Sequence, residues 1–187
     1  MEKFPWQLIP DWLNKNEALF WKEKLYENLS WEQPKVKLYG KYYLVPRKTI
    51  FLGGENVSYS YSGVTHRANG WPDWFKPLLN KVCEVSQNNY NGCLLNLYRD
   101  GKDRMGWHSD NEKELNPNNP ISSLSLGSSR DFFLKHRHLN IKEVLCLSNG
   151  DLLVMKPACQ KYWIHSVPIR KKINSYRINL TFRSYIT

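Results

Sequence analysis

The sequence lacks the features that mark several common classes of protein. No run approaches the ~18 consecutive apolar residues of a membrane span, and Pro5, Pro10 and Asp11 interrupt the segment where a signal peptide would need an apolar stretch. The chain has no GxGxxG or phosphate-loop motif, no internal repeat and no low-complexity tract. We therefore expect a globular protein that is not secreted and has no membrane contact. Depending on the source organism, it would act in the cytoplasm, with the nucleoid, or in a nucleus.

Cysteine is scarce. The 187 residues include four cysteines, with no CxxC motif and no paired spacing: Cys83, Cys93, Cys146 and Cys159. This pattern argues against a zinc ribbon and against a disulfide framework. We expect four reduced thiols that pack in the core as small apolar side chains.

Acidic residues are missing from two windows of a chain whose net charge is +10. Residues 33–54 contain five basic residues and no acidic one, and residues 152–187 contain seven basic residues and no acidic one. A charge run is often only a solvated face, but such faces usually mix signs. Two windows without acids favour a polyanionic partner.

Tyrosines alternate with lysines inside the first basic window. The run Leu38-Tyr39-Gly40-Lys41-Tyr42-Tyr43 predicts a short hairpin or tight bend at Gly40. Tyrosines beside lysines suit stacking on bases together with phosphate contact. They suit the packing of a half-buried strand equally well.

Hydrophobic periodicity predicts two helices and many strands. One helix follows a cap at Asp11 and extends to about Leu29, and the other runs from Pro72-Asp73 to about Gln87. Alternating segments bounded by turn signals predict strands at 42–46, 57–62, 92–98, 121–126, 131–135, 151–155, 161–167 and 175–183. Many short strands predict a mainly β protein of the α+β class, built on a barrel or jelly-roll sandwich with flanking helices.

Three ligand-type side chains form a candidate metal site. His108 and Asp110 are two residues apart, which places them on one face of an extended segment, and His165 would complete the set. Two imidazoles and one carboxylate occupy one face of an octahedral iron and leave three positions for a bidentate cosubstrate and O₂, whereas zinc prefers a closed tetrahedral set. Such a trio also arises by chance in many chains, so a second signal is needed.

The end of the chain supplies that signal. The segment Arg177-Ile178-Asn179-Leu180-Thr181-Phe182-Arg183 alternates polar and apolar residues without a break. An ordinary amphipathic strand exposes its polar face to water. Two arginines on one face can instead clamp a small dicarboxylate, because each guanidinium matches one carboxylate with two charge-assisted hydrogen bonds.

Together these motifs resemble the AlkB family of Fe(II)/2-oxoglutarate dioxygenases, over about residues 36–183. The resemblance extends to Asn96-Leu97-Tyr98-Arg99-Asp100-Gly101, which is similar to the family's N-x-Y-x-D-G segment, to Ser123-Leu124-Ser125-Leu126-Gly127 and to Arg130-Asp131-Phe132. It is closest to the branch that repairs alkylated bases in duplex DNA. The segments that carry this finer likeness are Val45-Pro46-Arg47-Lys48, Tyr59-Ser60-Tyr61-Ser62-Gly63 and Val167-Pro168-Ile169-Arg170-Lys171-Lys172.

The resemblance implies a single dioxygenase domain with a double-stranded β-helix core. Residues 1–34 would form an N-terminal helical extension, residues 35–70 a nucleotide-recognition lid of hairpins, and residues 71–187 a helix plus the jelly-roll catalytic core. Fe(II) would be held by His108, Asp110 and His165. The implied contacts to 2-oxoglutarate are Asn96, Tyr98, Arg177, Asn179, Thr181 and Arg183. Arg177 would take the C5 carboxylate beside Tyr98, with Arg183 and Asn96 near C1, although the sequence leaves open which arginine takes which end.

The implied chemistry is oxidative dealkylation of DNA bases such as 1-methyladenine and 3-methylcytosine. O₂ would oxidise 2-oxoglutarate to succinate and CO₂ and hydroxylate the N-alkyl carbon, after which the product collapses, releases formaldehyde and restores the base. Three alternatives stay open. The substrate could be a base in single-stranded DNA or RNA, or a protein side chain, and the chain could be a non-enzymatic DNA-binding module with a vestigial metal face.

The resemblance also implies contacts to a flipped base. Tyr39 is in register with the aromatic residue, usually phenylalanine, that fills the gap in the duplex. Tyr61 and the His108 ring would sandwich the base, and the other implied contacts are Tyr59, Ser62 and Glu112 at its polar edge and Arg47, Arg170, Lys171 and Lys172 at phosphates. Several of these residues have a plainer reading: a cross-strand core pair for the two tyrosines of residues 59–61, a solvated acid for Glu112, and a solvated turn for residues 170–172. Nothing indicates self-association, so we expect a monomer.

Overall fold

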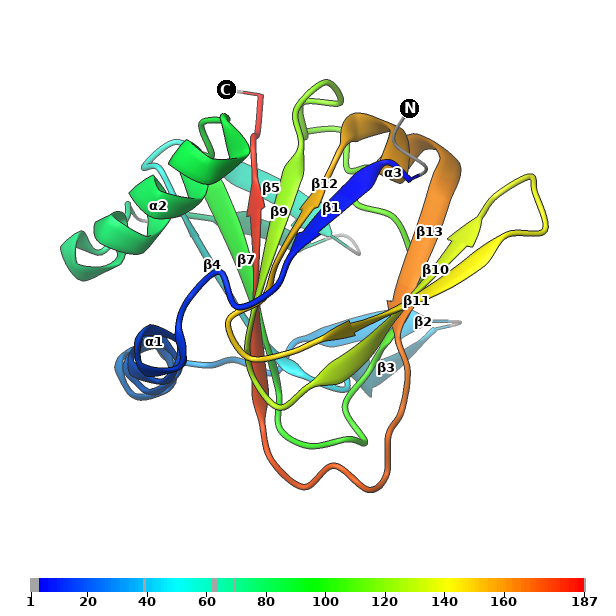
Figure 1. The fold of residues 1–187 in the computed structure, drawn as a ribbon, viewed down its shortest axis with the longest axis horizontal. Coiled ribbons are helices and arrows are strands. Elements are labelled where there is room, and N and C mark those ends of the chain that lie inside the picture. Colours follow the sequence, from blue (N-terminus) through cyan, green and yellow to red (C-terminus); the bar gives the residue numbers. More distant parts are fainter. Residues whose placement is uncertain (1–3, 39, 62–63, 69, 187) are drawn as a thin grey trace.

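Two facing β-sheets form the body of the protein (Figure 1). The computed structural model describes residues 4–38, 40–61, 64–68 and 70–186. The six-stranded sheet has the order β1-β12-β9-β14-β7-β4. Its strands are β1 (Trp6–Ile9), β4 (Lys48–Gly53), β7 (Gly92–Tyr98), β9 (Ile121–Gly127), β12 (Leu152–Met155) and β14 (Arg177–Arg183).

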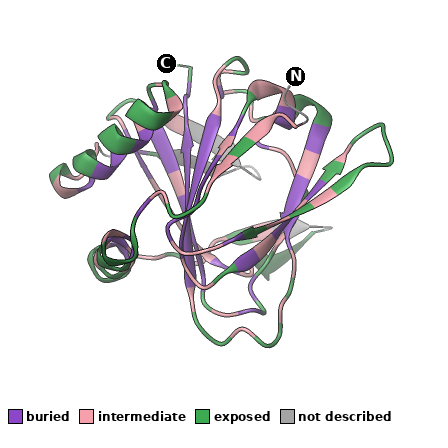
Figure 2. Ribbon diagram, viewed as in Figure 1, coloured by how far each residue is buried: buried purple, intermediate pink, exposed green. Residues whose placement is uncertain are grey.

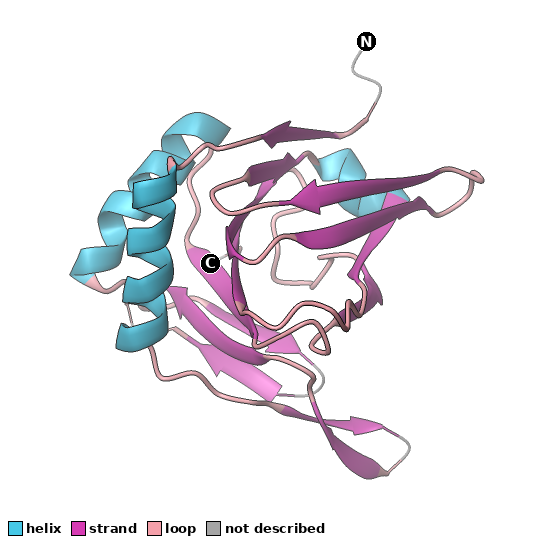
Figure 3. Ribbon diagram, turned by 60° about the horizontal axis from the view of Figure 1, so that its bottom comes forward, coloured by secondary structure: helices cyan, strands magenta, loops and turns pink. Residues whose placement is uncertain are grey.

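The second sheet has four strands in the order β11-β10-β13-β8. They are β8 (Met105–His108), β10 (Arg130–His136), β11 (Lys142–Leu147) and β13 (Trp163–Val167). Two hairpins accompany the sheets, one of β2 (Lys35–Leu38) and β3 (Lys41–Leu44), the other of β5 (Ser58–Tyr61) and β6 (Val64–Arg67). The β2–β3 hairpin projects from the body (Figure 3).

Helices cover the outer face of the large sheet (Figure 3). The two helices on this face are α1 (Lys15–Asn28) and α2 (Lys76–Ser86). A third, short helix, α3 (Pro157–Tyr162), leads directly into β13. Buried side chains of α1 and α2, such as Leu25 and Val82, share one core cluster with Leu180 and Phe182 of β14. This packing uses the apolar face of β14, so the polar face of the strand points to the other side, between the two sheets.

Strand β14 is buried over its whole length (Figure 2). It lies in the sheet between β7 and β9, which satisfy its backbone hydrogen-bonding groups on both sides. Its alternating sequence predicts this amphipathic strand, but the structure adds that the polar face is also withdrawn from water. The reading of residues 177–183 as a strand with a solvated polar face is therefore wrong, and the buried cationic face needs partners inside the molecule.

Several local predictions need correction. The cap of α1 is Asn14, whose side chain accepts the backbone N–H groups of Asn16 and Glu17, while the N–H of Asp11 bonds to Asp151. The backbone N–H of Asn14 in turn donates to the carboxylate of Glu17, so the two residues form a capping box at the start of α1. Residues 6–9 form the edge strand β1 inside the expected helical extension. The expected strand 161–167 begins only at residue 163, since 157–162 are helical.

The cysteines divide into two kinds. Cys93 and Cys159 are buried, as expected for core thiols. Cys83 is half-buried, and Cys146 is exposed on the edge strand β11, so the expectation of four core thiols is wrong. Residue 146 alternates with inward-facing neighbours on β11, and the outward side of that edge strand has no second layer above it. All four thiols are free.

A glycine joins the turn after β7 to the basic loop after β13. The N–H of Gly101 donates to the carbonyl of Ile173 at 2.8 Å, and the N–H of Arg170 donates to the carbonyl of Gly101 at 2.7 Å. A Cβ at residue 101 would lie 1.7 Å from the Arg170 carbonyl oxygen. Only glycine fits this close approach of two backbones.

We predict that Gly101→Ala lowers the free energy of unfolding by about 1–3 kcal/mol, because the added methyl pushes two backbones apart. Gly106→Ala is the matched control, since a Cβ there meets no heavy atom within 4 Å. Urea unfolding followed by circular dichroism measures both. Equal stability of the two variants would contradict the close approach.

Candidate metal and cosubstrate site

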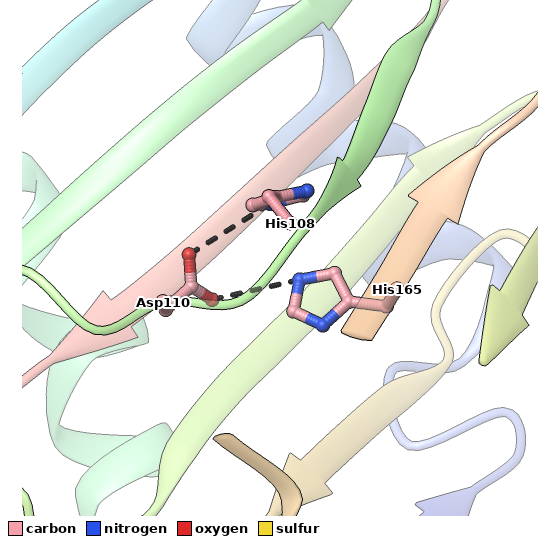
Figure 4. Close-up of side chains that lie close together, drawn as sticks. All are labelled: His108, Asp110 and His165. Carbon is pink, nitrogen blue, oxygen red and sulfur yellow. Dashed lines mark ion pairs between the residues drawn. The ribbon is translucent and has the colours of Figure 1, made fainter. Parts of the chain in front are cut away.

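Two paired strands bring the candidate ligands together (Figure 4). His108 ends β8, Asp110 follows two residues later, and His165 lies opposite His108 in the antiparallel β8–β13 ladder. The Nε2 atoms of His108 and His165 lie 3.9 and 3.8 Å from the two carboxylate oxygens of Asp110. One ligand atom from each residue falls within 4.8 Å of the others. Among the described residues, no second cluster of this kind occurs.

Each candidate ligand is held differently. Nδ1 of His108 bonds to the carbonyl of Gly106 at 2.9 Å, which leaves Nε2 facing the site. The buried His165 ring stacks on Phe132 with centroids 5.0 Å apart. Asp110 accepts a hydrogen bond from Arg183 at 2.5 Å. The three side chains are thus fixed by a backbone acceptor, by ring packing and by an ion pair.

Electrostatics favours the ligand forms of His165 and Asp110. Burial lowers the pKa of His165 to about 3, so its ring is neutral and the Nε2 lone pair is available. Burial alone would raise the pKa of Asp110, but the positive charge of Arg183 is the largest of the opposing effects and the pKa is lowered. Two imidazoles and a carboxylate are the donor set that binds Fe(II) on one face. The residues present therefore fit the metal.

The polar face of β14 contains a buried cation without an acid. One terminal nitrogen of Arg177 donates to Ser125 and to Asn179, both at 2.7 Å, and its guanidinium lies 5.4 Å from the centre of the Tyr98 ring. No carboxylate of the described residues lies within ion-pairing distance of Arg177. Burial lowers its pKa to about 10, and its buried Nε has no partner in the described chain. A carboxylate ligand would supply what this arginine lacks.

A cavity of about 460 Å³ joins these parts. It is lined by all three candidate ligands and by most of the residues that the sequence assigned to 2-oxoglutarate, namely Asn96, Tyr98, Asn179, Thr181 and Arg183. Arg177 lies behind Tyr98 and is not part of the lining. The cavity can thus hold a small dicarboxylate beside a divalent cation.

Two residues expected at phosphates lie elsewhere. Arg47 is 6% exposed and lines the cavity, where its Nε donates to Asn96 at 2.6 Å. The guanidinium of Arg170 pairs with Asp131 and covers the Phe133 ring. A phosphate at Arg170 would have to compete with that carboxylate. Lys171 and Lys172 are exposed, and Glu112 lines the cavity and accepts a bond from Arg183 at 3.1 Å.

The remaining predicted contacts cannot be placed. Tyr39 and Ser62 lie outside the described residues, and the structure describes only the backbone of Tyr59 and Tyr61, in β5. Their roles stay predictions.

One supporting residue was missed by the sequence analysis. Arg130 is 2% exposed and donates to the carbonyls of Asp100, Asp103 and Pro168. It ties the turn after β7 to the loop after β13 from inside the molecule. The segment Arg130-Asp131-Phe132 was noted as a motif, but a bond from a side chain to a distant carbonyl leaves no mark in sequence spacing.

Two facing sheets that enclose a His–Asp–His trio, with a buried arginine that has no carboxylate partner among the described residues, are the arrangement expected of an iron- and 2-oxoglutarate-dependent oxygenase. A model of the 2OG-Fe(II) oxygenase superfamily matches residues 6–183. The chain belongs to this superfamily and, within it, to the AlkB family. Membership confirms the expected jelly-roll core and the use of Fe(II) and 2-oxoglutarate.

Individual relatives agree with this assignment. The chain is 40% identical over 160 residues to the mouse DNA oxidative demethylase ALKBH2, a match that covers 81% of this chain and 67% of the relative. It is 33% identical over 187 residues to the human alpha-ketoglutarate-dependent dioxygenase alkB homolog 3, covering 95% and 65%. The chain thus spans about two thirds of the length of these relatives.

A solved structure of low sequence identity has a similar fold. The structure titled OsALKBH1 superposes with a TM-score of 0.67 over 98% of this chain and 100% of that one, at 16% identity.

Among the described residues, α1, α2 and α3 are all too short or too polar to cross a bilayer.

The ion pair at the metal ligand gives a testable stability effect. Arg183→Met leaves the carboxylate of Asp110 buried without its partner, which should cost about 3–5 kcal/mol at pH 7.5. The folded protein holds the pKa of Asp110 low, and its stabilising contribution is lost as the pH falls below the usual pKa. In the variant, burial raises the pKa instead, so protonation relieves the penalty. The stability deficit should therefore shrink between pH 7.5 and pH 5.

Urea unfolding of metal-free protein at the two pH values measures this difference. Arg104→Met is the control, because Arg104 is exposed and has no ion pair within the described chain. A deficit that does not change with pH would contradict the proposed cause.

Proposed function

We propose that this protein removes alkyl groups oxidatively from nucleic-acid bases and that duplex DNA with 1-methyladenine or 3-methylcytosine lesions is its substrate. The observation that carries the proposal is the shared cavity. Lys35 and Val36, at the base of the projecting β2–β3 hairpin, line the same space as the His–Asp–His trio. A base turned out of a duplex beneath that hairpin would present its alkyl group to the metal.

The hairpin has the surface that such a substrate requires. Strand β3 is exposed along its whole length, with Tyr42 69% and Tyr43 50% exposed, next to the exposed Lys41. Exposed aromatic rings beside lysines suit stacking on bases and contact with phosphates. Named relatives, the DNA oxidative demethylases ALKBH2, support DNA as the nucleic acid. The wedge role of Tyr39 stays a prediction.

The residues of the chain would divide the work as follows. His108, Asp110 and His165 would hold Fe(II), which when bound supplies the oxidation of 2-oxoglutarate by O₂ and the hydroxylation of the alkyl carbon. Arg177, already held by Asn179 and Ser125 next to Tyr98, would bind a carboxylate of 2-oxoglutarate at the edge of the cavity. Overall, methylated base, 2-oxoglutarate and O₂ would give the restored base, formaldehyde, succinate and CO₂.

Other side chains would orient these groups. Arg183 would keep Asp110 ionised and aimed at the metal, and it would hold Glu112 at the cavity wall. Arg47, bonded to Asn96, would present its remaining N–H groups to a ligand in the cavity. Lys171 and Lys172 would then contact phosphates, because Arg170 is paired with Asp131.

A lesion panel tests the function. Protein with Fe(II), ascorbate and 2-oxoglutarate should convert 1-methyladenine and 3-methylcytosine in an oligonucleotide, detected as a mass loss of one methyl adduct. Asp110→Ala should abolish conversion, because the site loses its anionic ligand, whereas Asp73→Ala, at an exposed surface ion pair, should not. Unchanged turnover in Asp110→Ala would refute the proposal.

The same panel separates the alternatives. Faster conversion of duplex DNA than of single-stranded DNA and RNA supports the proposed substrate, and a preference for either single strand assigns the enzyme to that class instead. Salt-dependent DNA binding without succinate formation would favour a non-enzymatic DNA-binding module.

The cosubstrate contact has its own test. Arg177→Lys should raise the KM for 2-oxoglutarate about 10- to 100-fold, since a point charge cannot replace a charge-assisted forked contact worth about 1.5–3 kcal/mol. Arg104→Lys is the control. The kcat at saturating 2-oxoglutarate should change less than the KM. An unaltered KM would mean that Arg177 does not bind the cosubstrate.

A further inference from the structure

The only carboxylate of the trio lies outside the β-ladder. His165 is inside β13, whose neighbours β10 and β8 both pair with it, and His108 is the last residue of β8. Asp110 comes two residues after β8 ends, in the loop that leads to β9. Strand pairing therefore positions both histidines, and something else must position the backbone of Asp110.

The segment Asp110-Asn111-Glu112 lies between two cavities. It forms part of the wall of the 460 Å³ cavity, and it lines a second cavity of about 830 Å³ as well. Outside the β-ladder, side-chain hydrogen bonds to the backbone can fix the position of such a segment.

One side chain makes such a bond to the backbone of the ligand. The N–H of Asp110 donates to Oε1 of Gln160 at 2.9 Å. The Nε2 of Gln160 in turn faces the sulfur of Met155 at 3.6 Å. The amide is thus oriented from both ends, with its oxygen toward Asp110. Gln160 lies on α3, the short helix that leads directly into β13 and His165, so one element supports two of the three ligands.

We propose that Gln160 is a positioning residue that sets the metal affinity of the site by fixing the backbone of Asp110. The proposal rests on the metal site of the proposed function and not on the nature of the substrate. Arg183 already binds one oxygen of the Asp110 carboxylate. Without the bond from Gln160, the loop is free to turn, and the carboxylate loses its place at the metal even though Arg183 still holds one of its oxygens.

The expected size of the effect follows from the role. Residues that orient a metal ligand without touching the metal typically change metal affinity about 10- to 100-fold when they are replaced. Gln160→Leu removes the acceptor with little change in volume. Gln160→Glu keeps an acceptor oxygen in the same place. Gln160→Asn keeps the amide but shortens the side chain by one methylene, so that it no longer reaches the Asp110 N–H.

The test is a titration of metal-free protein with Mn(II), in which electron paramagnetic resonance reports the free ion. We expect Gln160→Leu and Gln160→Asn to bind Mn(II) about 10- to 100-fold more weakly than the unaltered protein, and Gln160→Glu to retain its affinity. Lys161→Leu is the control, since Lys161 is exposed on the same helix. Circular dichroism establishes that each variant is folded.

Two results would overturn the proposal. One is unaltered Mn(II) affinity in folded Gln160→Asn or Gln160→Leu. The other is an equal loss in Gln160→Glu, which would show that the acceptor oxygen is not the cause. Should Gln160→Leu fail to fold, the comparison of the Asn and Glu variants decides. Because the titration contains neither nucleic acid nor O₂, its outcome is independent of the lesion panel.

Discussion

Strand β14 must bury both of its faces, and much of the site depends on that constraint. Its apolar face packs under α1 and α2, so its arginines, asparagine and threonine point between the sheets, where all four are buried. A guanidinium in such a place needs an anion. Arg183 finds Asp110 and Glu112, and Arg177 finds only neutral groups among the described residues. One strand thus places a cation with acid partners at the metal ligand, and a second cation without one among the described residues next to Tyr98.

The metal ligands are held with unequal firmness. The sheet carries both histidines, and a mutation would have to break a ladder to displace them. The carboxylate depends on single side chains, Arg183 for its direction and Gln160 for its backbone. The loop after β13 shows a similar contrast. Gly101 and Arg130 hold its backbone through hydrogen bonds, whereas the side chains of Lys171 and Lys172 remain exposed.

Periodic patterns within one segment could be read from the sequence, whereas contacts between side chains that are distant in sequence could not. The alternation in residues 177–183 predicts the strand and both of its faces, and the spacing of His108 and Asp110 predicts their common side. The pairing of His165 with His108 follows from the register of two distant strands, and the sequence offered His165 only as a ligand-type residue that could complete the set. The partners of Arg47 and Arg170, and the bond from Gln160 to Asp110, depend on side chains that meet only after folding, so neither charge nor family likeness revealed them.

The missing counter-ion of Arg177 also links folding to the composition of the surroundings. A cation that is buried without an acid makes the folded state more costly, and any carboxylate that reaches it stabilises the folded chain relative to the unfolded one. If Arg177 binds the cosubstrate as proposed, small dicarboxylates would act on the thermodynamics of the fold as well as on the active site. Since succinate also ends in two carboxylates, cosubstrate and product would both stabilise the folded chain.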